Sequence, residues 1–517
     1  MHNTKLPRFA KTYSGMSETN QSLTQKVPFL FALPASGGAL NSVYNGFFLL
    51  IAGSSLHLFS SILGGKLYFI GFSAILICHA ILAIISSNAN LIFLFRYFLV
   101  WLLIFAVAIT WAVWDGDVKV APFGANYQSI DVTRVLVFAG FLSLNGSFTG
   151  WLIGCRSLRS ESLPSFQLPH RYRSLLWMVG AVLALLFSVS YFFAAGGIVS
   201  SESYYGSGKG VDLQFSVFNI FQYIGISLLI LSSAAFSPLR KKFIWLAILT
   251  LIIGMLVGSR ADYMPQALLL LLIIFLRPLL GRFRQLSFVK AARLAFYGFT
   301  LILIAFFLGG FIAQWRFSGN ITDSFSFIIS SEYTGLLNYS YGHPVLWLET
   351  GSMAIGTLYA AIVNVKIGLI GLHWGSSYLD WILKLPPQFL GLPRPEGLEW
   401  SASIGGQIMS QGGIFEVSEA YWNFGLVGCF VVSFLISYLL AYLLQRGLRR
   451  TNLFNLLWYL TMGFMSLRGI WYQNFTYFRL FSIMMLLYIA AKGFAPWFIC
   501  SFQSARLLPR FRDSSVL

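Results

Sequence analysis

The amino-acid sequence predicts an all-α, polytopic integral membrane protein with about 12 transmembrane helices. Three observations predict this fold class: the composition, the number of long apolar runs, and the placement of the basic residues. Charged residues make up 10% of the 517 residues and hydrophobic residues 57%, whereas a soluble domain carries about 25% charged residues and about 45–50% apolar ones. So many apolar side chains are stable only where lipid replaces water as the solvent.

The apolar runs give the predicted positions of the helices. A helix needs about 20 predominantly apolar residues to cross a bilayer. The runs long enough to do so cover approximately residues 44–63, 67–87, 91–114, 133–154, 175–195, 213–236, 243–258, 264–281, 294–314, 424–445, 453–468 and 479–499.

The basic residues predict how these helices are oriented, because Lys and Arg resist translocation and stay cytoplasmic. If the N-terminal tail with Lys5, Arg8, Lys11 and Lys26 is cytoplasmic, alternation puts nearly every later basic cluster on the same side. These clusters lie at residues 156–173, 240–242, 282–293, 446–450 and 506–512. The net charge of +18 is therefore typical of cytoplasmic loop ends, and no nucleic-acid partner is predicted.

The predicted organisation follows from these spans. A cytoplasmic tail (1–43) precedes transmembrane helices 1–9 (44–314), a large external loop (315–423), helices 10–12 (424–499) and a second cytoplasmic tail (500–517). The loop contains an apolar stretch, Met353 to Leu372, which Lys366 interrupts. A further span there would move the basic cluster at 446–450 outside. We therefore expect an interfacial or re-entrant helix.

Several arginines fall on or near the external face, where basic residues are disfavoured: Arg260, Arg316, Arg394, Arg468 and Arg479. One interpretation is structural, since arginines at helix ends reach toward lipid headgroups or pair locally, as Arg260 can with Asp262. The other is functional. A guanidinium binds phosphate bidentately and keeps its charge, so several around one cleft suit a lipid diphosphate.

Carboxylates and aromatic residues meet where the large loop leads into the tenth span. Glu416 and Glu419 precede Tyr421, Trp422 and Asn423. Such residues form ordinary interfacial belts. Alternatively, a carboxylate deprotonates a sugar hydroxyl while neighbouring rings and the amide contact the sugar. His343, also in the loop, is a further candidate base, although a lone histidine is more often a structural hydrogen-bonding residue.

Missing motifs narrow the class of function. Nucleotide-binding glycine loops and the HExxH and GxSxG motifs are absent. Acidic residues deep within spans, as expected of an ion-coupled transporter, are nearly absent, and Arg96 is the main charge inside a span. Asp115 and Asp117 have an Asp-x-Asp spacing that can hold a divalent cation, but this pair is common by chance. No metal and no cofactor are predicted.

The sequence resembles the Wzy-type oligosaccharide repeat unit polymerases, which are relatives of the O-antigen ligases. The resemblance rests on the many-span layout with one large late loop, Gly258-Ser259-Arg260, Arg316 beyond the ninth span, and residues 419–425 (EAYWNFG) re-entering the membrane. The layout covers nearly the whole chain, but the motifs are short.

The resemblance implies a GT-C-like glycosyltransferase of lipopolysaccharide or polysaccharide biosynthesis, in the bacterial inner membrane with both termini cytoplasmic. It would join undecaprenyl diphosphate-linked glycans at the periplasmic face without nucleotide sugar or metal. Arg260, Arg316, Arg468 and Arg479 would bind the diphosphate, and Glu419, Glu416 or His343 would activate the acceptor hydroxyl. The expected partners are these lipid-linked glycans, membrane lipids and a chain-length regulator protein.

Three alternatives remain open at this stage. An O-antigen ligase shares nearly every feature except the acceptor. A flippase or other transporter shares the composition and the basic loops, but it is expected to show pseudo-symmetric halves and polar residues at mid-membrane depth. A structural assembly protein is the third alternative.

Overall fold

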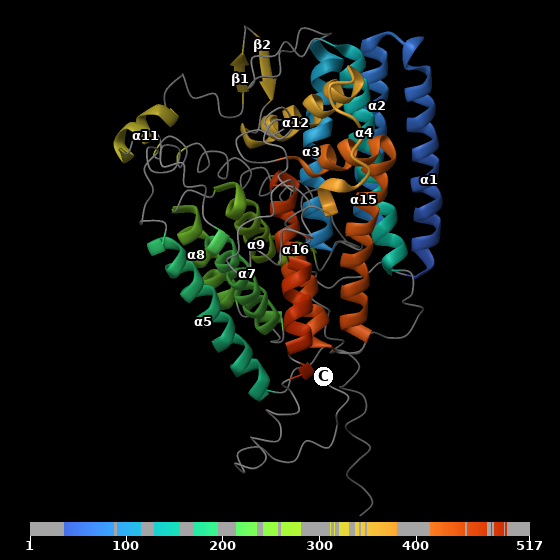
Figure 1. Ribbon diagram of the computed structural model, residues 1–517. Helices are drawn as coiled ribbons and strands as arrows, with labels where there is room; N and C mark the ends of the chain where they lie inside the picture. The colour runs from blue at the N-terminus through green and yellow to red at the C-terminus, as the bar shows by residue number, and fades with distance from the viewer. Residues whose placement is uncertain are drawn as a thin grey trace, which may run out of the picture.

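In the residues that it describes, the computed structural model has helices and one short β-hairpin (Figure 1). It describes residues 36–86, 90–114, 129–155, 170–194, 213–234, 241–256, 260–280, 311, 315, 320–329, 337–340, 343–346, 349–379, 414–449, 452–472, 477, 480–490 and 492–493. The α-helices are α1 (Ser36–Leu58), α2 (Gly65–Ser86), α3 (Leu91–Trp114), α4 (Ile130–Cys155), α5 (His170–Ala194), α7 (Leu213–Ala234), α8 (Lys241–Leu256), α9 (Arg260–Leu280), α11 (Ile321–Ile329), α12 (Glu349–Lys366), α15 (Glu416–Arg449) and α16 (Leu453–Tyr472).

These helices follow the apolar runs of the sequence. Six of them, among the described residues, are long and apolar enough to cross a membrane, and α3 has the highest mean hydropathy. Most ends lie within a few residues of the prediction, but α1 begins at Ser36 instead of residue 44. The predicted run 294–314 lies almost entirely outside the described residues. The run 479–499 is helical from Leu480 to Ala490.

The helices form two groups, with α16 between them (Figure 1). One group contains α1 to α4, α12 and α15, and the other contains α5, α7, α8 and α9. Helix α16 packs against α15 and α3 on one side and against α7 and α9 on the other. A hydrogen bond from the Thr461 hydroxyl to that of Ser227 (3.1 Å) joins α16 to α7. Residues of α16 therefore contact both halves of the molecule.

Helices α4 and α15 approach each other most closely, along a row of glycines in α4. Gly146, Gly150 and Gly154 recur every four residues and face α15. A Cβ atom on Gly146 or Gly150 would lie 2.2 Å from the carbonyl oxygen of Phe430 or Phe434, respectively. Only glycine fits there. Spacing of small residues at every fourth position is typical of close helix packing in membranes.

The predicted external loop contains more structure than the sequence indicated. Strands β1 (Leu337–Ser340) and β2 (His343–Leu346) form an antiparallel pair in which Ser340 faces His343. The all-α prediction missed this hairpin. Helix α12 ends at Lys366, whereas the prediction carried the helix to Leu372. Residues 354–359 of α12 are all buried, and α12 packs against α15 and α4. Its interfacial or re-entrant placement in a membrane stays a prediction.

Candidate functional site

The first part of α15 folds back on the rest of that helix. Gly425 has φ 62° and ψ −148°, a backbone conformation that favours glycine and interrupts the helix. Beyond this bend, the thiol of Cys429 lies 3.8 Å from the carbonyl oxygen of Val417. Residues 416–424, called the fold-back segment below, therefore lie against the start of the long helix. The predicted span beginning at residue 424 corresponds only to the portion after the bend.

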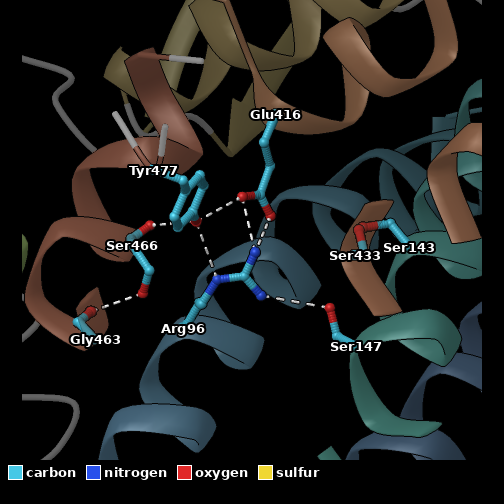
Figure 2. A network of polar contacts seen from close by, with 8 residues as sticks. All are labelled: Arg96, Ser143, Ser147, Glu416, Ser433, Gly463, Ser466 and Tyr477. Atoms are coloured by element: carbon cyan, nitrogen blue, oxygen red, sulfur yellow. Dashed lines mark hydrogen bonds and ion pairs between the residues drawn. The ribbon is translucent and has the colours of Figure 1, made fainter. Parts of the chain in front are cut away.

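A buried ion pair fixes the beginning of the fold-back segment (Figure 2). The Nη2 atom of Arg96 lies 2.6 and 2.8 Å from the two carboxylate oxygens of Glu416. Both side chains are 2% exposed. Arg96 comes from the second turn of α3, so the pair connects α3 to the fold-back segment.

Two further side chains complete this cluster (Figure 2). Arg96 donates through Nη1 to the Ser147 hydroxyl of α4 and through Nε to the Tyr477 hydroxyl, both at 3.4 Å. The Tyr477 hydroxyl lies 3.1 Å from Oε2 of Glu416 and 3.2 Å from the carbonyl oxygen of Ser466 in α16. The term "buried cluster" is used below for Arg96, Glu416, Tyr477 and Ser147.

The buried cluster shows a pairing that was not predicted from the sequence. Glu416 was predicted to precede the tenth span as part of a polar boundary or a catalytic site, without a named partner. It lies among α3, α4 and α16. A buried charge is stable only when it is paired and hydrogen-bonded. Glu416 therefore supplies the countercharge that Arg96 requires.

Glu419 lies one helical turn further along the fold-back segment and is fully buried. The Ser377 hydroxyl donates to its Oε1 atom at 3.1 Å. Asn423 Nδ2 lies 2.7 Å from that hydroxyl and 2.8 Å from the carbonyl oxygen of Glu419. On the other side of the segment, the hydroxyls of Thr357 in α12 and Ser418 are 2.9 Å apart. Ser377 thus orients the carboxylate, Asn423 supports Ser377, and the contact between Thr357 and Ser418 joins the fold-back segment to α12.

The three predicted sugar-contacting residues lie in different environments. Trp422 is 2% exposed, and its ring lies against that of His373 with centroids 4.2 Å apart. Asn423 is fully buried and accepts a hydrogen bond from the backbone N–H of Gly375 at 3.1 Å. Tyr421 is half-buried. Of the three, Tyr421 has the most accessible side chain, while Trp422 and Asn423 hold the turn at 373–377.

Two of the predicted diphosphate-binding arginines lie on neighbouring helices. Arg260 begins α9, and Arg468 is a half-buried residue of α16. These helices pack together, with Gln266 Nε2 donating to the Phe464 carbonyl oxygen at 3.3 Å. Arg316, Arg394 and Arg479 lie outside the described residues. For His343 the structure gives only the backbone, in β2. The roles of these residues stay predictions.

In the part of the chain that the structure describes, no group of three or more His, Cys, Asp or Glu residues is placed to hold a metal ion. Asp115 and Asp117 lie outside it.

Comparison with known proteins gives no indication of function, so any functional assignment depends on the geometry of the fold-back segment. No protein-family model, no curated protein and no solved structure matches this chain. The six long apolar helices decide the broad class. This is a multi-pass membrane protein. Within it, the fold-back segment is the described region that gathers the most buried polar and charged side chains around one short stretch of chain.

Proposed function

We propose that this membrane protein is a glycosyltransferase that polymerises undecaprenyl diphosphate-linked oligosaccharide repeat units at the periplasmic face of the bacterial inner membrane. The observation that carries the proposal is the fold-back segment. It connects Glu416 through Tyr477 to α16, the helix that carries Arg468, one of the arginines predicted to bind diphosphate. Glu419 lies one helical turn further along the same segment. A carboxylate and a diphosphate-binding group are the two components that this transfer requires.

The proposed reaction assigns a distinct role to each component. The acceptor hydroxyl gives its proton to a carboxylate while its oxygen bonds to the anomeric carbon of the donor sugar. The bond from that carbon to the diphosphate oxygen breaks, and the electron pair leaves on undecaprenyl diphosphate. Arginines already in place stabilise this developing charge most strongly in the transition state. No nucleotide is consumed.

Glu419 is the better candidate for the base. Both carboxylate oxygens of Glu416 accept hydrogen bonds from Arg96, and one also contacts Tyr477. The negative charge of Glu416 is therefore already paired with the guanidinium. Glu419 is held by the neutral hydroxyl of Ser377. The hydrogen bond from Ser377 fixes the direction of one carboxylate oxygen, and a base in a fixed orientation is what proton transfer from an acceptor hydroxyl requires.

Replacing Glu419 by glutamine tests this assignment. We expect Glu419→Gln to lower polymerisation turnover by about 10²–10⁴-fold, the usual loss on removing a general base. The measurement is polymer formation by purified protein from lipid-linked repeats, at matched protein amounts. Asp323→Asn makes the same chemical change at an exposed site on α11 and is expected to retain activity. Near-normal turnover of Glu419→Gln would remove Glu419 from catalysis.

The same assay separates a polymerase from a ligase. With lipid-linked repeats as the only glycan substrate, a polymerase produces a ladder of lengthening chains. A ligase produces none until a lipid A core acceptor is added. A flippase forms no glycosidic bond under either condition.

The proposed topology has about 12 spans with both termini cytoplasmic. It predicts that a reporter fused after Ser340, at the end of β1, reports the periplasm, while a reporter after Arg449, at the end of α15, reports the cytoplasm. Paired alkaline phosphatase and fluorescent protein fusions measure the two sides. If both positions report the same side, the number of spans between them differs from the proposal by an odd number.

A further inference from the structure

We propose that Tyr477 and Arg96 are positioning residues. They hold the fold-back segment, which carries the carboxylates (the carboxylate half of the proposed site), at a fixed position relative to α16, which carries Arg468 (the arginine half). This inference rests on the proposed glycosyltransferase function. Neither residue was predicted to belong to the site from the sequence. The proposal starts from the position of one atom, the Tyr477 hydroxyl oxygen, which contacts both halves (Figure 2).

The carboxylate half is connected through Glu416. The Tyr477 hydroxyl lies 3.1 Å from Glu416 Oε2. Glu419 follows Glu416 by three residues in the same short helix, a distance of about 4.5 Å along the helix axis. A shift of Glu416 therefore displaces the backbone of Glu419 by a similar amount, because the fold-back segment moves as one helical unit.

The arginine half is connected through α16. The same hydroxyl lies 3.2 Å from the carbonyl oxygen of Ser466, and Arg468 is two residues further along that helix. In the sequence, Arg479 follows Tyr477 by two residues. A hydroxyl has one proton, so Tyr477 donates to either the carboxylate or the carbonyl while lying within reach of both.

Arg96 supplies the third contact. Its Nε atom donates to the Tyr477 hydroxyl at 3.4 Å while its Nη2 atom pairs with Glu416. The guanidinium is planar and rigid, so it fixes the angle between the phenol and the carboxylate. Arg96, Tyr477 and Glu416 thus form a closed triangle, and each corner comes from a different part of the chain.

The consequence for catalysis concerns distance rather than charge. Removing the Tyr477 hydroxyl leaves the Arg96–Glu416 pair and the ring packing in place. It removes a hydroxyl that lies within hydrogen-bonding distance of both Glu416 and the Ser466 carbonyl oxygen of α16. A displacement of about 1 Å between catalytic groups can cost about 10²-fold in rate. We therefore expect Tyr477→Phe to lower kcat by about 10²-fold and to change KM by less than about threefold, since substrate contacts are retained.

Tyr459→Phe is the matched control. Tyr459 is buried, as Tyr477 is, lies in α16, and exchanges hydrogen bonds with Asn90 at 3.1 and 3.2 Å. Its loss also removes a buried hydroxyl but leaves the buried cluster untouched. We expect the two variants to lose similar thermal stability, while only Tyr477→Phe loses kcat. Equal kcat in Tyr477→Phe and wild type would overturn the proposal, as would an equal loss in both variants.

The distance between the fold-back segment and α16 can be measured directly, without any assay of activity. Nitroxide labels on Tyr421→Cys in the fold-back segment and Asn455→Cys in α16 report the separation of the two halves, with Cys78 and Cys500 replaced by serine. Tyr477→Phe is expected to broaden or shift the electron–electron distance distribution, and Tyr459→Phe to leave it unchanged. An unchanged distribution in Tyr477→Phe overturns the inference. If wild-type protein makes no polymer but the distribution still broadens, the proposed reaction fails while the mechanical link stands.

Discussion

Arg96→Ala is expected to lower the free energy of unfolding by about 3–5 kcal/mol, the cost of leaving one partner of a buried pair without its countercharge. Glu416 would keep its burial and lose its closest contacts, which are the two short bonds from Nη2. Glu416→Ala is expected to cost a similar amount, because it leaves the guanidinium charge of Arg96 in the same place. Reversible unfolding in mixed micelles measures both values.

A double variant distinguishes two costs in stability: the cost of losing the ion pair, and the cost of leaving one buried charge without its partner. Arg96→Met combined with Glu416→Leu fills the space with apolar groups and is expected to recover most of the lost stability. Asp131→Ala is the control, because Asp131 also pairs with an arginine, Arg134, but its side chain is 62% exposed. Its expected cost is below about 1 kcal/mol. A double variant that is no more stable than either single one would contradict this account.

Gly150→Ala is expected to destabilise the protein by about 1–3 kcal/mol, although alanine is a better helix former than glycine by about 1 kcal/mol. The added Cβ would lie 2.2 Å from the Phe434 carbonyl oxygen. Since both atoms belong to rigid helices, α4 and α15 must separate along their contact. Combining Gly146→Ala with Gly150→Ala is expected to exceed either single loss.

Gly493→Ala is expected to change the stability in the opposite direction from Gly150→Ala, or not at all. A Cβ on Gly493 meets nothing within 4 Å, so helix propensity alone acts and a small gain in stability, or none, is expected. Thermal unfolding of the purified variants, followed by exposure of the buried thiols of Cys155 and Cys429, gives both values. Equal stability of Gly150→Ala and wild type would show that α4 and α15 pack less closely than described.

The helices were largely predictable because their signal is local. A run such as 91–114 has enough consecutive apolar residues to specify a span by itself, and α3 coincides with it. The fold-back segment was not predictable in this way. Glu416 and Glu419 read as a polar boundary before a span, because their burial depends on Gly425, whose backbone bend is not visible from hydropathy.

Individual residues of the site were predictable from the sequence, but the contacts between them were not. Glu416 and Glu419 were recognised from the sequence as unusual carboxylates beside aromatic residues. Arg96 was recognised as an unusual charge, but its partner lies 320 residues away and Tyr477 lies 381 residues away. Pairing across such separations leaves no periodic signal. A usable signal did exist, because an arginine within an apolar span requires an acid, and only 17 acidic residues are available.

The separation between Arg96 and Glu416 also constrains biosynthesis. At about 5–20 residues per second, a ribosome needs roughly a quarter of a minute to a minute to add the intervening 320 residues. Throughout that interval α3 is already made while its countercharge does not yet exist. The nascent protein therefore has to delay the final docking of α3 against its neighbours, or shelter the guanidinium at an insertase or a lipid headgroup. A chain that stops before residue 416 carries Arg96 without the carboxylate that pairs with it in the full-length protein.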